Sequence, residues 1–175
     1  MGAGRSTSDR RWTRGAGRGR KAAMIRPETP DLPLEALTPE EWEALCDGCG
    51  RCCLLKLEDE ETGELAYTSV HCRLYDPQSC RCGNYALRKA LVPGCVVLTP
   101  ATLAEIAPWM PSTCAYRLRF EGRPLPDWHP LRTGDPTSPR RAGIAADGLN
   151  PPGRLTPEWE VDEDDLEDYA LEGTL

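Results

Sequence analysis

The residues with the most specific chemistry in this chain are clustered cysteines. The stretch Cys46-Asp47-Gly48-Cys49-Gly50-Arg51-Cys52-Cys53 holds four thiols and two glycines in eight residues. Thiolate is the form of cysteine that binds metal, and neighbouring glycines let a backbone fold tightly enough for several sulfurs to converge. The remaining five cysteines follow before residue 115 in the chain: Cys72, Cys80, Cys82, Cys95 and Cys114.

The composition indicates that these cysteines supply cohesion to the fold. Leu, Ile, Val and Phe make up less than a fifth of the 175 residues, and the net charge is -7, which together favour disorder unless something else holds the chain. A disulfide scaffold or a metal site could replace part of a hydrophobic core.

The cellular compartment decides between disulfides and metal. The twin arginine Arg10-Arg11 could suggest an export signal, but no apolar run follows it, and no stretch approaches the eighteen apolar residues of a membrane span. Disulfides need an oxidising compartment and are normally accompanied by a signal peptide. We therefore expect a cytoplasmic protein with reduced thiols that bind metal.

The spacing of the first cysteines resembles an iron-sulfur site. Cys46-x2-Cys49-x2-Cys52 has the spacing of the first three ligands of a bacterial ferredoxin-type [4Fe-4S] site, although that run continues with x3-Cys-Pro and this one continues with Cys53. Adjacent residues of an extended chain face opposite ways. We therefore expect that one of Cys52 and Cys53 ligates, while the other faces a second centre or the core.

The later cysteines can complete the ligand set. Cys80-x-Cys82 puts two thiols on one face if the chain is extended there, and Cys72 and Cys95 flank this pair. Eight cysteines suffice for two four-thiolate sites or for one larger cluster, which leaves a ninth. Cys114 lies in an apolar helix pattern, and the sequence leaves open whether it is a ligand or a buried core residue.

Iron and zinc compete for such a ligand set because both accept four thiolates. The overlapping three-ligand run favours an iron-sulfur cluster, with Zn²⁺ as the alternative. His71 and His129 could each replace a thiolate, but a lone histidine is more often structural. The candidate metal ligands are Cys46, Cys49, Cys52, Cys53, Cys72, Cys80, Cys82, Cys95 and Cys114.

Short elements must position these thiols. Thr38 and Glu41 form a capping box around Pro39, which predicts a helix over 39–45 that delivers Cys46 at its end. Alternation around the turn at 60–63 predicts a hairpin of strands 54–57 and 65–70. Cap and proline signals predict further helices over 84–91, from Thr99-Pro100 to before Pro108, and over 112–121. We predict a small irregular α+β domain of short helices and a hairpin gathered around the thiolates.

Charge and proline content divide the chain into four segments. We expect a disordered basic arm over 1–26, which a translation start at Met24 would largely remove, and a metal-binding cysteine-cluster domain over 27–134. Prolines and glycines predict an extended segment over 135–157, and nine acids without a base predict a solvated acidic tail over 158–175.

Beyond the cluster itself, several blocks carry a family resemblance. They are Glu41-Trp42-Glu43-x-Leu45-Cys46-Asp47-Gly48-Cys49-Gly50-x-Cys52-Cys53-Leu54, Cys72-Arg73-Leu74, Cys80-x-Cys82-x-Asn84-Tyr85, Thr113-Cys114-Ala115-Tyr116-Arg117-Leu118 and Leu125-Pro126-x-Trp128-His129-Pro130-Leu131. Over residues 36 to 134 the chain resembles the bacterial YcgN-type members of the YkgJ family of cysteine-cluster proteins, described as carrying a zinc- or iron-chelating CxxCxxCC domain. The resemblance implies metal chelation with Cys46, Cys49, Cys52 and Cys53 as motif positions, raises Cys114 as a ligand, and implies no particular reaction or substrate.

Three classes of function are compatible with these features. The first is an iron-sulfur or zinc protein with a redox or regulatory role. The second is an enzyme, which would need an open metal position or a base beside a thiol nucleophile, and no acid-base pair is evident near the two histidines. The third is a structural zinc module that acts as an adaptor for a protein partner, through Trp128-His129-Pro130 or the acidic tail. We expect no membrane partner and regard nucleic acid as an improbable one.

Overall fold

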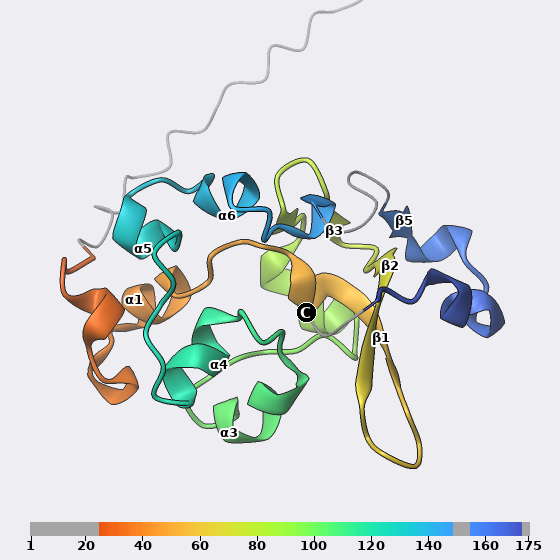
Figure 1. The fold of residues 1–175 in the computed structure, drawn as a ribbon, viewed down its shortest axis with the longest axis horizontal. Coiled ribbons are helices and arrows are strands. Elements are labelled where there is room, and N and C mark those ends of the chain that lie inside the picture. Colours follow the sequence, from red (N-terminus) through yellow and green to blue (C-terminus); the bar gives the residue numbers. More distant parts are fainter. Residues whose placement is uncertain (1–24, 149–154, 173–175) are drawn as a thin grey trace, which may run out of the picture.

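The computed structural model describes residues 25–148 and 155–172 (Figure 1). Its α-helices are α1 (Pro39–Ala44), α2 (Arg88–Leu91), α3 (Leu103–Ile106), α4 (Ala115–Phe120), α5 (Pro130–Thr133) and α6 (Ser138–Arg141). Its strands are β1 (Leu54–Glu58), β2 (Leu65–His71), β3 (Tyr75–Asp76), β4 (Arg81–Cys82) and β5 (Thr156–Pro157). Short 3₁₀ helices occupy Thr29–Asp31, Leu34–Ala36, Arg51–Cys53, Tyr85–Leu87, Ala107–Trp109, Ala146–Gly148, Glu158–Glu160 and Glu163–Tyr169. These elements confirm the predicted small α+β fold.

Helix α1 begins at the capping box that the sequence predicted. The Thr38 side chain accepts the Glu41 N–H at 3.3 Å, and the Glu41 carboxylate accepts the Thr38 N–H at 3.0 Å. Glu41 is buried and also accepts hydrogen bonds from the Arg26 guanidinium and from the Thr29 hydroxyl. Of the predicted basic arm, the structure describes only residues 25 and 26. Arg26 is held in place by the Glu41 carboxylate.

We expect Glu41→Gln to lower the melting temperature of the protein, whereas Glu40→Gln, at the exposed neighbouring position, leaves it nearly unchanged. The hydrogen bond from Arg26 and those from the Thr38 backbone hold the pKa of Glu41 far below its usual range. A carboxylate with a depressed folded-state pKa stabilises above its unfolded pKa of about 4.3, and this contribution is lost as the pH falls below that value. Thermal unfolding at pH 7 and pH 3 measures both effects, and equal melting temperatures for the two variants at pH 7 would contradict this role.

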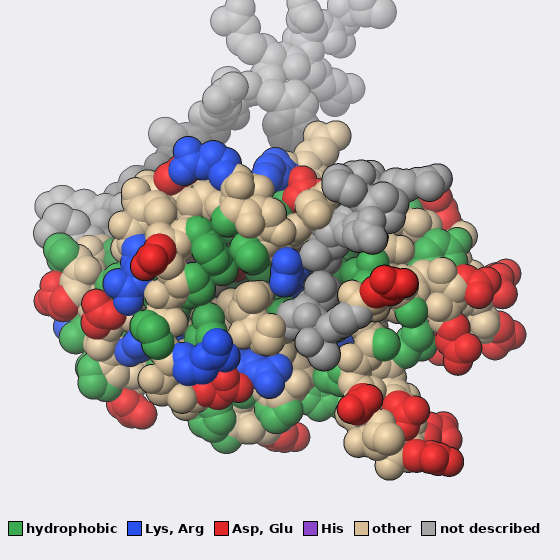
Figure 2. All heavy atoms as spheres, in the orientation of Figure 1, with side chains coloured by type: hydrophobic (Ala, Val, Ile, Leu, Met, Phe, Trp, Pro, Cys, Tyr) green, Lys and Arg blue, Asp and Glu red, His purple; other side chains and the backbone are tan. Residues whose placement is uncertain are grey.

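The hairpin is also formed as predicted. β1 and β2 pair antiparallel, with Leu57 opposite Ala66 and an irregularity in register between Leu54 and Lys56. β5 adds a parallel third strand beside the end of β2. Figure 2 shows acidic side chains gathered at the tip of the hairpin and over the C-terminal 3₁₀ helices.

Two small cores flank the chain that connects α1 to β1. The first packs helices against one another and contains Trp42, Leu45, Leu103, Ala107, Ala115, Tyr116 and Leu125. The second packs strands against the segment after α6 and contains Leu54, Tyr67, Tyr75, Cys80, Ala145 and Ala146. The cysteine-rich loop therefore lies at the junction of two cores, neither of which is large.

Several segments differ from the expectation. α3 begins at Leu103, later than Thr99, and α4 begins at Ala115, so Cys114 occupies its N-cap position. The described part of the predicted extended segment contains α6 and the 3₁₀ helix Ala146–Gly148, because Ser138, Ala145 and Ala146 are buried. The acidic segment packs on the sheet, where the Leu171 N–H donates to the Tyr67 carbonyl at 2.7 Å. No helix in the described ranges is both long enough and apolar enough to cross a bilayer.

Candidate metal centre

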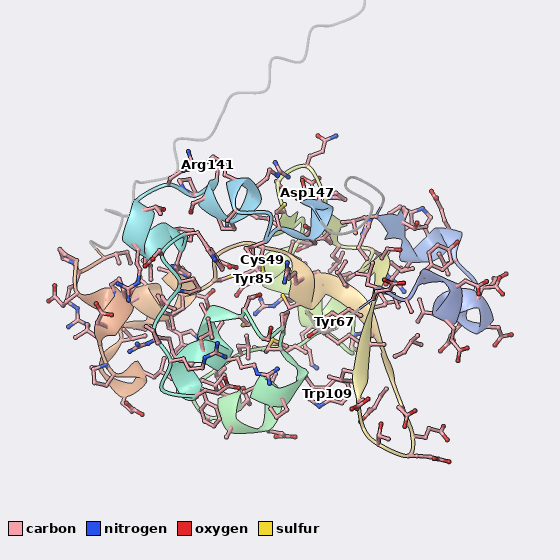
Figure 3. All side chains as sticks on the ribbon, viewed as in Figure 1. Cys49, Tyr67, Tyr85, Trp109, Arg141 and Asp147 are labelled. Atoms are coloured by element: carbon pink, nitrogen blue, oxygen red, sulfur yellow. The ribbon has the colours of Figure 1, made fainter. Side chains whose placement is uncertain are left out.

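The cluster loop, residues 46–53, turns twice through left-handed glycines. Gly48 has φ +73° and Gly50 has φ +75°, which residues with a side chain rarely adopt. Asp47 stabilises the first turn, because its Oδ1 accepts the Cys49 N–H at 3.0 Å. The Cys49 carbonyl in turn accepts the Ala146 N–H at 2.7 Å, which ties the loop to the segment after α6. Figure 3 shows Cys49 in the middle of the molecule.

Arg51 fastens the loop to two distant segments. The Arg51 side chain is buried; its Nε donates to the Ile144 carbonyl at 2.6 Å, and its Nη1 lies 3.4 Å from the Thr113 hydroxyl, next to Cys114. Burial lowers the pKa of the guanidinium, and the neighbouring Cys49 and Asp47 oppose this shift. A fixed positive charge therefore lies among groups that carry negative charge when deprotonated.

Three thiols share the surroundings of this loop. Burial raises the pKa of Cys46 to about 12, and the Cys52 and Cys114 thiols are among the groups that raise it further. Burial likewise raises the pKa of Cys49 well above its usual range and that of Cys114 to about 12. At neutral pH without metal, these three groups are therefore protonated thiols.

Cys52 differs from them, because its pKa is lowered and theirs are raised. A hydrogen bond with Cys53 lowers the pKa of Cys52 to about 7, and the ammonium of Lys56 contributes to the same shift. The hydrogen bond correspondingly raises the pKa of Cys53. Lys56 is anchored by the carbonyls of Cys52 at 3.3 Å and Leu54 at 3.2 Å, so its charge is held beside the sulfur.

Three further cysteines lie on the other side of the loop. The Cys72 N–H donates to the Cys53 carbonyl at 2.9 Å, and Cys82 pairs with Tyr75 in the small sheet β3–β4. Burial raises the pKa of Cys95, and the Cys72 and Cys82 thiols add to the shift, which brings Cys95 into the same neighbourhood. No strand forms at Cys95.

Cys80 stands apart from the other eight thiols. Its backbone is left-handed, with φ +53°, and its buried sulfur lies 3.1 Å from Nη2 of Arg140 and 3.8 Å from Oδ1 of Asp147. Arg140 and Asp147 form an ion pair at 2.9 Å. The extended backbone that would make Cys80 and Cys82 a two-ligand clip is therefore interrupted at Cys80.

The donor set fits a thiolate-bound metal in kind and in neighbourhood. Among residues 25–148 and 155–172, no three His, Cys, Asp or Glu side chains are held together at metal-binding distances. The sulfurs lie close enough to shift one another's pKa, and Oδ2 of the buried Asp47 is without a hydrogen-bond partner in the same ranges. Cysteine thiolates are ligands that suit zinc and iron.

Both histidines are held by backbone groups. The His129 ring is fully buried; its Nε2 lies 3.1 Å from the Leu45 carbonyl, and its Nδ1 accepts the Leu131 N–H at 3.1 Å. This arrangement fixes a neutral ring with the proton on Nε2, which supports the residue before Cys46. The His71 Nδ1 lies 2.9 Å from the Cys72 carbonyl. The His129 ring is therefore a structural support for the segment before Cys46, whereas His71 is engaged through Nδ1.

The stability of the protein is expected to depend on pH through His129. Burial lowers the pKa of His129 below its value of about 6.5 in an unfolded chain. The unfolded state therefore binds the additional proton, and the stabilisation present above pH 6.5 is lost as the pH falls toward the folded-state pKa. Urea unfolding at pH 7.5 and pH 5.5 should show a larger loss for the wild type than for His129→Gln. An identical pH dependence for both proteins would contradict a buried neutral ring.

Several residues that shape the site gave no signal in the sequence. Lys56 lies four positions from Cys52 but within a strand, and Arg140 and Asp147 lie 60 and 67 positions from Cys80. Only Arg51 and Asp47 could have been suspected, since they lie within the cysteine motif itself.

Comparisons with known proteins agree with this donor set. Residues 45–115 match a family named CxxCxxCC and described as "Putative zinc- or iron-chelating domain". A UPF0260 protein of Rhodobacter capsulatus is 55% identical over 151 residues, which cover 86% of this chain and 98% of that protein. UPF0260 proteins of Granulibacter bethesdensis, with 61% identity over 79% of this chain and 78% of the relative, and of Azotobacter vinelandii, with 49% over 86% and 97%, are also similar.

No solved structure matches the chain. The expected resemblance to a cysteine-cluster family is confirmed at the level of the CxxCxxCC domain, and the YcgN-type subtype stays a prediction. With 55% identity over 151 residues to a relative that it covers almost completely, the chain belongs to the UPF0260 family of proteins, and its residues 45–115 match the CxxCxxCC domain.

Proposed function

We propose that this protein binds an iron-sulfur cluster through its clustered cysteine thiolates and that it acts in a redox or regulatory role. The observation that carries this proposal is the cluster loop, in which the left-handed Gly48 and Gly50 turn a backbone that carries cysteines at the spacing of a ferredoxin-type ligand run. When bound, such a cluster would supply one-electron chemistry. The residues of this chain would hold it through sulfur and surround it with the buried charge of Arg51.

The protonation of the thiols supports a role in chelation. Metal binding requires thiolates and therefore displaces protons from Cys46, Cys49 and Cys114, whose pKa values are raised by burial. Cys52, with its pKa near 7, offers sulfur in the reactive form from the start. With both nitrogens of the His129 ring engaged by backbone groups, acid-base catalysis by this histidine has little support.

A structural zinc module that presents a surface to a protein partner is the second candidate. The specific observation in its favour is that the thiols lie between two small cores, where a metal would join them as a folding element. Cytoplasmic location fits either role and is part of the proposal.

The two candidates are separated by metal and acid-labile sulfide analysis, with a visible spectrum, of protein purified without oxygen. Iron and sulfide in near-equal amounts with a brown chromophore that bleaches on reduction support the iron-sulfur proposal. Zinc without sulfide or colour, together with unfolding on chelation, contradicts it and supports the structural module. Protein that contains neither metal and takes up neither would overturn both.

A further inference from the structure

A cleft lies between the β1–β2 hairpin and the segment that connects α3 to α4. Its volume is about 340 Å³, at the small end of the range for ligand pockets, which suits a few side chains rather than a folded domain. Glu58, Leu65 and Tyr67 form the hairpin wall; Glu58 pairs with Leu65, and Tyr67 follows two positions later on the same face. The opposite wall includes Pro108 and Trp109, and Figure 3 shows Tyr67 and Trp109 near each other beside the hairpin.

Hydrogen bonds hold the two walls of the cleft in place. The hydroxyl of the buried Tyr67 donates to the Trp109 carbonyl at 3.0 Å. In the second wall, Nη1 of Arg117 donates to the carbonyl of the fully buried Met110 at 2.7 Å. The cleft is therefore formed before any ligand binds, which lowers the entropic cost of binding.

The cleft presents an aromatic side chain and a carboxylate to solvent. Trp109 is 42% exposed, although its backbone carbonyl is anchored to Tyr67. Glu58 is exposed, and none of the ion pairs among residues 25–148 and 155–172 engages it. The face of an indole ring attracts a cation, and a nearby carboxylate adds to this attraction. This pair of side chains therefore favours a positively charged ligand.

The positive charges next to the cleft are already engaged. Nε of Arg117 forms an ion pair with Glu121 at 2.8 Å. Nζ of Lys56 lies 5.1 Å from the centre of the Tyr67 ring, and two backbone carbonyls hold it beside the cluster loop. Neither side chain therefore neutralises the carboxylate of Glu58.

The hairpin tip beyond the cleft is acidic throughout. Residues 57–72 contain no Lys or Arg, and they contain five acids, namely Glu58, Asp59, Glu60, Glu61 and Glu64. These acids are exposed, and Figure 2 shows acidic side chains gathered at the tip. A ligand that extends from the cleft along the hairpin meets one negative charge after another, which favours a ligand with several positive charges.

We propose that this cleft binds a basic peptide segment of a partner protein, with one arginine side chain stacked on Trp109 and paired with Glu58. Arginine suits this position because its planar guanidinium both stacks on aromatic faces and binds carboxylates through two hydrogen bonds. A peptide fits better than a small amine, since Leu65 and Pro108 offer apolar contacts beside the charged ones. The inference goes beyond the proposed function and does not depend on which metal the thiols bind.

Fluorescence anisotropy of a fluorescein-labelled hexa-arginine peptide, titrated with the full-length protein, tests this proposal. The wild type should bind the peptide, more weakly as the salt concentration rises. Trp109→Leu should weaken binding about tenfold, and Trp109→Phe, which keeps an aromatic face, should weaken it less. Glu58→Gln should weaken binding about threefold, and it decides the matter if thermal unfolding shows that Trp109→Leu is not folded.

The matched controls are Trp159→Leu and Glu160→Gln. They change an exposed tryptophan and an exposed glutamate on the C-terminal 3₁₀ helices, the other acidic surface of the molecule. Both controls should leave binding of the peptide unchanged. Equal weakening by Glu58→Gln and Glu160→Gln would indicate general attraction between a basic peptide and an acidic protein, and would overturn the proposed site.

Other occupants of the cleft give different results, and each would overturn the peptide proposal. Spermine that competes as tightly as the peptide would indicate a site for free amines. Binding that appears only when Arg10, Arg11 and Arg14 of the full chain are replaced by Gln would assign the cleft to the basic arm. A dimer in native mass spectra that Trp109→Leu dissociates would assign it to a second copy. The metal and sulfide analysis judges the proposed function separately from all of these outcomes.

Discussion

Gly50→Ala should destabilise the folded protein by about 2–5 kcal/mol, the sum of a left-handed backbone penalty and an overpacking penalty. Gly50 has φ +75°, and a Cβ at this position would lie 2.2 Å from the Tyr75 hydroxyl oxygen and 2.5 Å from its ring. Tyr75 is buried in the second core, so it has little room to move. The loop would open, and the thiols on it would lose their common orientation.

Gly48→Ala is the matched control for this experiment. Gly48 has nearly the same φ, +73°, but its added Cβ would approach no atom closer than 3.9 Å. We expect Gly48→Ala to lower the free energy of unfolding by the backbone penalty alone, about 1–2 kcal/mol. Urea unfolding of the metal-free proteins measures both values. Equal midpoints for the two variants would show that Tyr75 does not close on the loop as described.

Cys49→Ser should lower bound metal by at least one ion per chain and lower the melting temperature at the same time. Cys49 is buried at the centre of the cluster loop, and bound metal stabilises only the folded state that assembles its ligands. Serine at this position offers a poor metal ligand in place of a thiolate. Metal analysis and thermal unfolding of the same preparation check whether the two losses occur together.

Cys80→Ser controls for the loss of a buried thiol. Cys80 is 9% exposed and Cys49 is 6% exposed, so the two substitutions remove comparable buried groups. The Cys80 variant should keep its metal, because its sulfur lies beside Arg140 and Asp147 rather than beside other thiols. Unchanged metal content in Cys49→Ser, or equal metal loss in both variants, would rule out the ligand role assigned to Cys49.

Local signals made the elements around the motif predictable. The capping box of Thr38 and Glu41 depends on residues three positions apart, and the hairpin depends on one turn, so the sequence alone predicts α1, β1 and β2. The starts of α3 and α4 were predicted less accurately, because both helices begin later than the sequence signals indicated. The Thr99 side chain accepts the Thr102 N–H at 3.2 Å in a turn before α3, so a valid capping interaction pointed to a helix that starts later.

Long-range contacts decided what the sequence could not show. Composition predicts extended chain around residues 135–148, but Arg51 and Cys49 bind the backbone of Ile144 and Ala146, nearly a hundred positions away. Sequence spacing likewise could not show which of the nine cysteines lies apart from the others. The sequence leaves open whether Cys114 is a ligand or a core residue, and the left-handed backbone of Cys80 has no signature in sequence spacing.

X-ray absorption spectroscopy at the edge of the bound metal tests most directly the claim that this protein chelates metal through cysteine thiolates. The account predicts a first shell made only of sulfur, at about 2.3 Å for zinc, because the clustered donors of this chain are cysteines and both ring nitrogens of His129 are engaged by backbone groups. The result should hold whether the native metal is iron or zinc. A first shell that contains nitrogen or oxygen ligands in place of sulfur would contradict it.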